Sequence, residues 1–260
     1  MPRFNANIVT MFKEHDMLDR FAAAADCGFK GVELLFPYDW PMDELRRRME
    51  AAGQEMVLIN TPPGDYANGE RGFAGIPGAE DRFREDFKRA LEYAVALGSP
   101  RIHVMAGRIP ADATAERCEA VFVENLKAAA DLAGPEGVTL CLESLNSRDV
   151  PGYLVLSPAT VRRAIDKVGR PNVAFQYDAY HLQIMQGDLA ETFRRYRDIV
   201  GHVQVSSLPG RHEPDGGEIN YPYLFAFLDA EGWDGWVGCE YAPRAGTKEG
   251  LAWAAAWGIG

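Results

Sequence analysis

The chain has 260 residues, of which 47% are hydrophobic and 25% charged, a composition typical of a globular protein with a full core rather than of a disordered chain. Its net charge of −11 disfavours the clustered positive surface that nucleic-acid binding requires, so we expect no nucleic-acid partner. No secretory signal opens the sequence and no apolar run is long enough to span a bilayer, so we expect a cytoplasmic protein without a membrane segment.

Short apolar runs rich in β-branched residues alternate along the chain with longer amphipathic segments. We predict strands at 4–9, 31–36, 56–60, 101–106, 138–143, 173–178, 202–206 and 235–240. The segment 81–98 illustrates the helices between them, because its apolar residues recur every three or four positions and a glycine, Gly98, follows as a C-terminal cap.

Eight strands that alternate with helices indicate a parallel sheet, because parallel neighbours need a crossover connection. The number and spacing of these units favour a single (β/α)8 TIM barrel that occupies residues 1–260 as one domain. Two long connections, 61–80 after the third strand and 207–220 after the seventh, lie where such a barrel keeps its active site. We interpret them as lids or substrate walls.

Polar side chains stand at or near the ends of the last four predicted strands. These are Glu143, Asp178, Gln204 and Glu240, each separated from the next by about one strand-and-helix unit. For any one of them, a helix cap or a solvent-facing residue is the alternative, but four in successive units indicate a shared site at one end of the barrel. Carboxylate and amide oxygens suit a hard divalent cation, so we predict a Mg²⁺ or Mn²⁺ site.

Two further side chains are candidates for substrate binding. His181 follows Asp178 by three residues and would donate a hydrogen bond to substrate oxygens, with a capping or packing role as the alternative. Arg211 lies in the connection after the seventh strand and could bind a substrate carboxylate with its planar fork. The pattern does not decide whether His103, inside the fourth strand, faces into the barrel.

Several long motifs resemble those of the hydroxypyruvate isomerase family, which belongs to the xylose-isomerase-like barrels. They are RFNANIVTMF at 3–12, GVELLFPYDW at 31–40, NTPPGDYANGERGFAGIPG at 60–78, QYDAYHLQIMQGDL at 176–189, HVQVSSLPGRHEPDGGEINYPYLF at 202–225 and GWVGCEYAPR at 235–244. The likeness covers essentially the whole chain.

The resemblance implies a metal-assisted isomerisation that interconverts hydroxypyruvate and tartronate semialdehyde. Its paired catalytic glutamates fall on Glu143 and Glu240, and its metal ligands on Glu143, Asp178, Gln204 and Glu240. Which glutamate first removes the proton is left open. The 2-oxo-tetronate isomerases share nearly all of these motifs, so they remain an alternative.

Three other readings use the same barrel. Ketose 3-epimerases have a histidine at the third ligand position, where this chain has Gln204. A phosphodiesterase resembling endonuclease IV would need a multi-histidine zinc site and a basic face, which five scattered histidines and the acidic charge disfavour. A sugar-acid binding protein without catalytic activity would have no evident need for both glutamates. The expected partner is a small hydroxy-keto acid, and a homo-oligomer of the chain is a further candidate.

Overall fold

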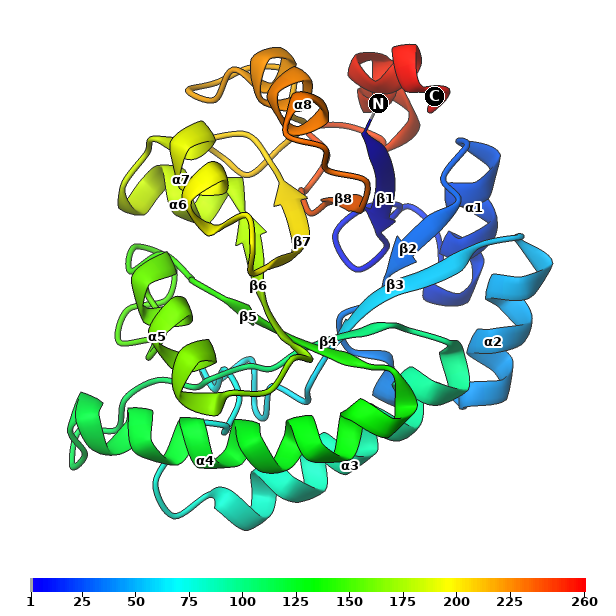
Figure 1. Cartoon of the computed structure of the whole chain (residues 1–260). Helices are drawn as coiled ribbons and strands as arrows, with labels where there is room; N and C mark the ends of the chain where they lie inside the picture. The colour runs from blue at the N-terminus through cyan, green and yellow to red at the C-terminus, as the bar shows by residue number, and fades with distance from the viewer. Residues whose placement is uncertain (1) are drawn as a thin grey trace.

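Eight parallel strands close into a barrel in the order in which they occur along the chain, as seen in the computed structural model (Figure 1). The structure describes residues 2–260. The strands are β1 (Arg3–Asn7), β2 (Gly31–Glu33), β3 (Glu55–Asn60), β4 (Arg101–His103), β5 (Thr139–Glu143), β6 (Val173–Asp178), β7 (Val200–Val205) and β8 (Trp236–Cys239). Because β8 pairs with β1, the ring is complete and the predicted (β/α)8 fold is confirmed.

Every predicted strand is present, but five end earlier than the sequence indicated, two of them by three residues. The second stops at Glu33 and the fourth at His103, each three residues before its predicted end. Beyond His103, the backbone amide of Met105 donates to the hydroxyl of Thr61 instead of to a neighbouring strand. A loop side chain therefore replaces a strand-to-strand backbone hydrogen bond at this point. A pattern of apolar residues does not reveal such a replacement.

The helices form a ring outside the barrel. They are α1 (Arg20–Asp26), α2 (Met42–Ala51), α3 (Glu80–Leu97), α4 (Ala115–Ala133), α5 (Pro158–Val168), α6 (Ala179–Met185), α7 (Leu189–Tyr196) and α8 (Tyr221–Ala230), with 3-10 turns at Met17–Asp19, Pro37–Asp39, Gly134–Glu136 and Lys248–Trp257. The predicted helix over 81–98 is α3, and Gly98 caps it in the left-handed conformation with φ 65°. Among these helices, none is long and apolar enough to cross a membrane.

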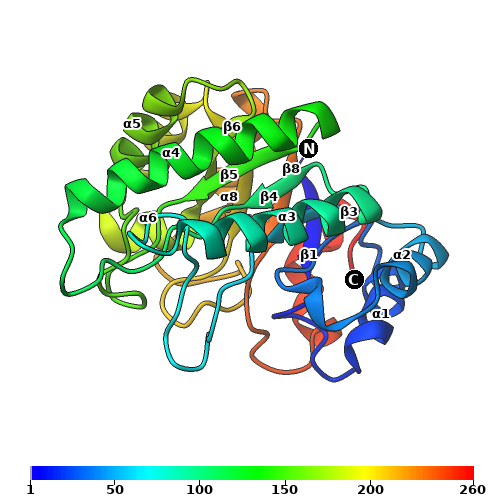
Figure 2. The ribbon, with the colours of Figure 1, turned by 90° about the horizontal axis from the view of Figure 1, so that it is seen from below.

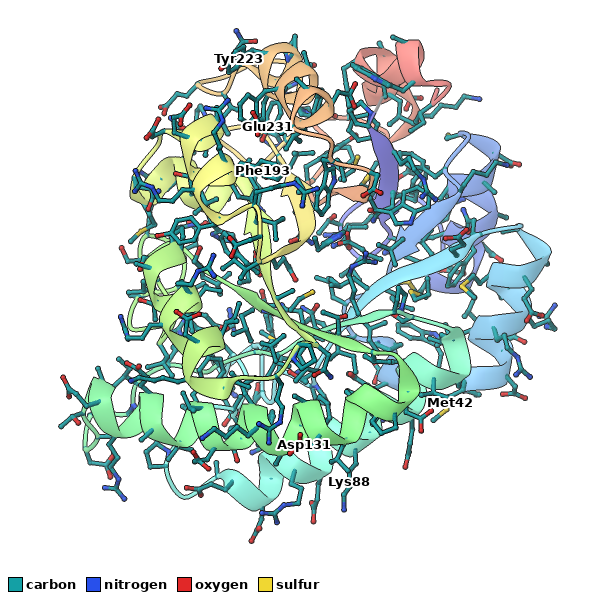
Figure 3. All side chains as sticks on the ribbon, in the orientation of Figure 1. Met42, Lys88, Asp131, Phe193, Tyr223 and Glu231 are labelled. Atoms are coloured by element: carbon teal, nitrogen blue, oxygen red, sulfur yellow. The ribbon has the colours of Figure 1, made fainter. Side chains whose placement is uncertain are left out.

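Amphipathic patterning explains how the helices lie against the barrel. In Figure 3, Lys88 and Asp131 project from the outer surfaces of α3 and α4, and both are exposed. Phe193 lies on the inner side of α7 and is fully buried. Such one-sided burial is what a helix with apolar residues every three or four positions requires.

The long connections after β3 and β7 both leave from the carboxyl ends of the strands. The connection after β3 is visible in Figure 2 as a loop that extends well beyond the barrel. Its middle is held by backbone hydrogen bonds, for example from Gly75 N to Ala106 O at 2.7 Å. The connection is therefore anchored to the strand end next to it, and it forms a wall of the site described below.

Candidate functional site

Three carboxylates meet at the carboxyl-terminal end of the barrel. Glu143 is the last residue of β5, Asp178 the last of β6, and Glu240 follows β8 directly. The side chains of Glu143 and Asp178 are buried, and that of Glu240 is 12% exposed. Three of the four strand-end residues predicted from the sequence thus converge, because parallel strands of a closed barrel end on the same face.

Glu143 and Glu240 border a pocket of about 160 Å³. Its polar lining consists mainly of Glu143, His181, Glu240, Arg211, Arg71 and His103. Pockets for drug-sized ligands measure roughly 300–1,000 Å³, so this one suits a much smaller molecule.

Burial and crowding disfavour negative charge on all three carboxylates at once. Burial raises the pKa of Glu143 well above its ordinary value, and the neighbouring Glu240 and Asp178 raise it further. Burial also raises the pKa of Asp178, and it raises that of Glu240 to about 8 although Arg211 opposes the change. Such a cluster ionises fully at neutral pH when a cation joins it, which is the behaviour expected of a metal site.

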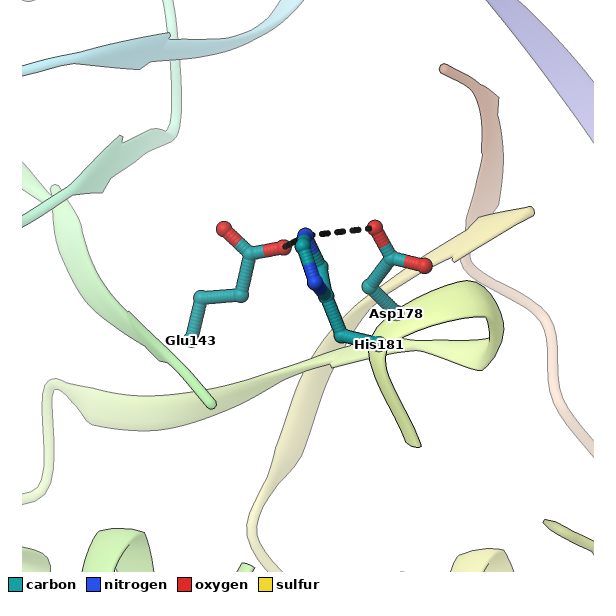
Figure 4. A group of neighbouring side chains, drawn as sticks. All are labelled: Glu143, Asp178 and His181. Carbon is teal, nitrogen blue, oxygen red and sulfur yellow. Dashed lines mark ion pairs between the residues drawn. The ribbon is translucent and has the colours of Figure 1, made fainter. Parts of the chain in front are cut away.

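His181 lies between Glu143 and Asp178 (Figure 4), with its Nε2 atom 3.7 Å from a carboxylate oxygen of each. One ligand atom from each of these three buried residues lies within 4.8 Å of the others, so the group could bind a metal ion. The backbone N–H of Asn146, however, donates to His181 Nδ1 at 3.1 Å. This bond needs the lone pair of Nδ1, so the proton of the neutral ring is on Nε2.

The charge state of His181 agrees with that assignment. Burial lowers its pKa well below the ordinary value, and Arg211 and His103 lower it further. A neutral imidazole with its Nε2–H directed at the carboxylates is a hydrogen-bond donor. The arrangement therefore supports the predicted donor role of His181 better than a role as metal ligand.

Arg211, predicted to anchor a substrate carboxylate, is already paired with protein carboxylates. Its Nη2 atom lies 3.1 Å from Asp178 Oδ2 and 3.0 Å from Glu240 Oε1, and its guanidinium lies over the ring of Tyr180. Burial disfavours the charged guanidinium, but Glu240 and Asp178 outweigh this effect and raise the pKa of Arg211 above its ordinary value. The structure brings Arg211 into the site, where it neutralises part of the carboxylate cluster.

Gln204, predicted as a fourth ligand, is fully buried in β7 with both ends of its amide hydrogen-bonded. Its Oε1 accepts from Gln176 Nε2 at 2.6 Å, and its Nε2 donates to Glu33 Oε2 at 2.8 Å. A hydrogen bond from Gln204 also lowers the pKa of Glu240, so the two side chains are neighbours. An amide oxygen has two lone pairs, so Oε1 of Gln204 could bind a metal ion while it accepts the hydrogen bond from Gln176. The role of Gln204 as a metal ligand stays a prediction.

Glu33, which was not among the residues predicted from the sequence, is fully buried beneath the site. Its carboxylate accepts hydrogen bonds from Asn5 Nδ2 at 2.8 Å, His202 Nε2 at 2.7 Å, Gln204 Nε2 at 2.8 Å and Asn7 Nδ2 at 3.4 Å. Burial favours the neutral acid, but His202 and these hydrogen bonds hold the pKa of Glu33 below its ordinary value. The available signal was a charged residue in the middle of the apolar run GVELLF.

His103, whose direction the sequence left open, faces into the barrel. It is buried, with Nδ1 3.6 Å from Glu143 Oε2, and burial lowers its pKa to about 3. It is therefore a neutral side chain beside the carboxylates. Arg71, on the connection after β3, is another pocket residue that no sequence pattern indicated.

Comparison with known proteins agrees with this fold. The model of the xylose isomerase-like TIM barrel family matches residues 21–257. A 2-oxo-tetronate isomerase of Cupriavidus necator is 52% identical and the hydroxypyruvate isomerase of Escherichia coli 44% identical. In the first comparison 97% of each chain is covered, and in the second 97% of this chain and 98% of the relative.

Solved structures give the same fold. A protein from Brucella melitensis described as an AP endonuclease of family 2 has a TM-score of 0.96 and 48% identity, with 99% of both chains covered. A D-psicose 3-epimerase has a TM-score of 0.76 at 18% identity, with 90% of this chain and 83% of the epimerase covered, a likeness that shows the fold alone. The chain therefore belongs to the xylose isomerase-like TIM barrel family, and with relatives of this similarity it is an isomerase.

Proposed function

We propose that the protein is a divalent-metal-dependent isomerase of a small hydroxy-keto acid, with Glu143 and Glu240 as its acid–base pair. The observation that carries this proposal is the pair of glutamates with raised pKa values on one small pocket, with Asp178 beside them. A carboxyl group whose pKa lies near neutrality can both remove and return a proton, which an ordinary surface glutamate does poorly.

The reaction moves a carbonyl group between adjacent carbons. In hydroxypyruvate, the hydroxyl-bearing carbon loses a proton to one glutamate, and the electron pair forms the enediolate. A proton then returns to the neighbouring carbon, while the hydroxyl proton passes to the former carbonyl oxygen, so no atom is gained or lost. A positioned base contributes about 10²–10⁴-fold to such a transfer.

The residues proposed to hold the metal are Glu143, Asp178, Gln204 and Glu240. Their oxygen atoms suit Mg²⁺ or Mn²⁺ as ligands. A bound cation would also relieve the mutual repulsion of the three carboxylates, which contributes to the raised pKa of Glu143. When bound, the ion supplies Lewis-acid polarisation of the substrate oxygens. The Nε2–H of His181 would donate to the oxygen on which negative charge develops.

Hydroxypyruvate and tartronate semialdehyde are the proposed substrate pair. A 2-oxo-tetronate, one carbon longer, is the second candidate, favoured by the 52% identity to a 2-oxo-tetronate isomerase. A free ketose finds less support, because the similarity to 3-epimerases is confined to the fold. A nuclease activity fits poorly with a small pocket lined by carboxylates in a chain of net charge −11.

Turnover by metal-stripped and reloaded protein tests the proposal. Hydroxypyruvate, 2-oxo-tetronates, free ketoses and an abasic-site DNA duplex would be assayed side by side with Mg²⁺, Mn²⁺ or chelator. We expect metal-dependent isomerisation of at least one hydroxy-keto acid, with kcat/KM well above that for any ketose. Cleavage of the DNA, or turnover of ketoses alone, would overturn the assignment.

A further inference from the structure

A second arginine enters the catalytic pocket from the connection after β3. Arg71 lines the pocket together with Glu143, Glu240 and Arg211, although it is far from all of them in the sequence. The pocket thus contains two guanidinium groups that are far apart in the sequence. It also contains carboxylates, which when ionised would repel an anionic substrate. A cationic side chain that the protein carboxylates have not already paired would favour an acid substrate over a neutral one.

The two arginines differ in their partners. Arg211 makes ion pairs with Asp178 and Glu240 at about hydrogen-bond distance. Arg71 makes hydrogen bonds only to backbone carbonyls, from Nη1 to Tyr66 O at 2.9 Å and to Glu70 O at 2.6 Å, and within residues 2–260 it has no ion pair with an acidic side chain. Its Nε and Nη2 groups therefore remain available to a ligand.

The guanidinium of Arg71 is also held in place. It stacks over the ring of Tyr66 at 3.6 Å from the centroid, and that ring packs against Phe36. The next residue, Gly72, has φ 90°, and a Cβ atom there would lie 2.3 Å from the backbone oxygen of Met105. The loop therefore follows β4 closely at this point, and a fixed planar fork loses little entropy when it binds a carboxylate.

We propose that Arg71 binds the carboxylate of the substrate and so determines specificity for acids over neutral sugars. With the carboxylate at the loop, the two carbons that exchange the carbonyl lie toward Glu143 and Glu240. Arg211 then pairs with the protein carboxylates Asp178 and Glu240 and not with the substrate carboxylate. This inference rests on the proposed function for its link to turnover, but the binding of an acid by Arg71 can be measured separately.

The test compares D-glycerate with its neutral amide, D-glyceramide, as ligands of metal-loaded protein by calorimetry. Glycerate has the carboxylate of hydroxypyruvate but a hydroxyl in place of its ketone, so it cannot be isomerised in this way. We expect the wild-type protein to prefer glycerate and Arg71→Met to lose that preference, with about 100-fold weaker glycerate binding from the lost charge-assisted bonds. Arg71→Lys keeps the charge without the fork and should fall between them.

Arg82→Met is the matched control. Arg82 also stacks on an aromatic ring of this loop, Phe73, at 3.8 Å, but it does not line the pocket. In steady-state assays, Arg71→Met should raise KM for the acid substrate with little change in kcat, the sign of lost uniform binding. Arg82→Met should change neither constant.

Three results would overturn the inference. They are an unchanged glycerate preference in both Arg71 variants, no preference in the wild-type protein, and loss of the preference in Arg211→Lys instead. The last result would restore the expectation from the sequence that Arg211 is the anchor. If wild-type protein isomerises no acid but binds glycerate through Arg71, the proposed function fails while the inference on Arg71 stands.

Discussion

Replacement of Glu33 by glutamine should destabilise the protein strongly, although the two side chains have the same shape. One oxygen of Glu33 accepts from Asn5 and His202, and the other accepts from Gln204 and Asn7. A glutamine offers one oxygen and one NH₂ group. Whichever way the new amide turns, its NH₂ faces two donors, and these buried donors lose their acceptor.

The size of the effect follows from those contacts. A hydrogen bond to a charged group contributes about 1.5–3 kcal/mol. Loss of two such bonds to the Glu33 carboxylate therefore predicts a decrease of about 3–6 kcal/mol in the free energy of unfolding. That is a large fraction of the roughly 5–15 kcal/mol typical of a folded protein.

Urea unfolding of metal-free protein, followed by both fluorescence and circular dichroism, measures the change. Coincident transitions by the two probes are needed for a two-state analysis. Glu55→Gln is the control, because Glu55 begins β3 but is exposed, and its replacement should change stability by less than about 0.5 kcal/mol. A loss below about 1 kcal/mol in Glu33→Gln would refute the reasoning, since Glu33 would then not be an ionised acceptor of these bonds.

Three more predictions concern the site itself. Glu143→Gln and Glu240→Gln should each lower kcat by about 10²-fold or more while retaining measurable metal binding, and the double variant should be little worse than either single one. Near-normal turnover of both with metal bound would show that another group moves the proton. In the metal-free protein, burial raises the pKa of Glu240 to about 8, and the pKa values of Glu143 and Asp178 are also raised. The folded state therefore binds more protons than the unfolded state, so stability should fall as the pH rises from about 4.5 toward 8, and Mn²⁺ should raise the melting temperature more at pH 8 than at pH 6. A metal effect independent of pH would contradict this linkage. Arg211→Lys replaces the planar guanidinium, which contacts both Asp178 and Glu240 through Nη2, by a more mobile ammonium group. It should lower kcat by about tenfold and change KM for the acid less, and the reverse pattern in steady-state assays would assign Arg211 to the substrate.

The sequence by itself determined the barrel and the residues at its strand ends. Periodicity of apolar residues is a local property, and the rule that parallel strands need crossovers turns eight such runs into one topology. The carboxyl ends of those strands then lie on one face, so Glu143, Asp178 and Glu240 could be placed together before any contact was known.

Tertiary structure decided which partners those side chains have. The ion pairs of Arg211, the hydrogen bond from Asn146 that sets the proton on His181, and the position of Arg71 in the pocket all join segments distant in the sequence. Burial in particular depends on everything packed around a group. Burial raises the pKa values of the carboxylates, and it makes Glu33 indispensable as the acceptor for the buried donors around it. A local sequence pattern does not reveal the burial or the partners of a side chain. The energy of a buried charge is set by neighbours that only the closed barrel brings together.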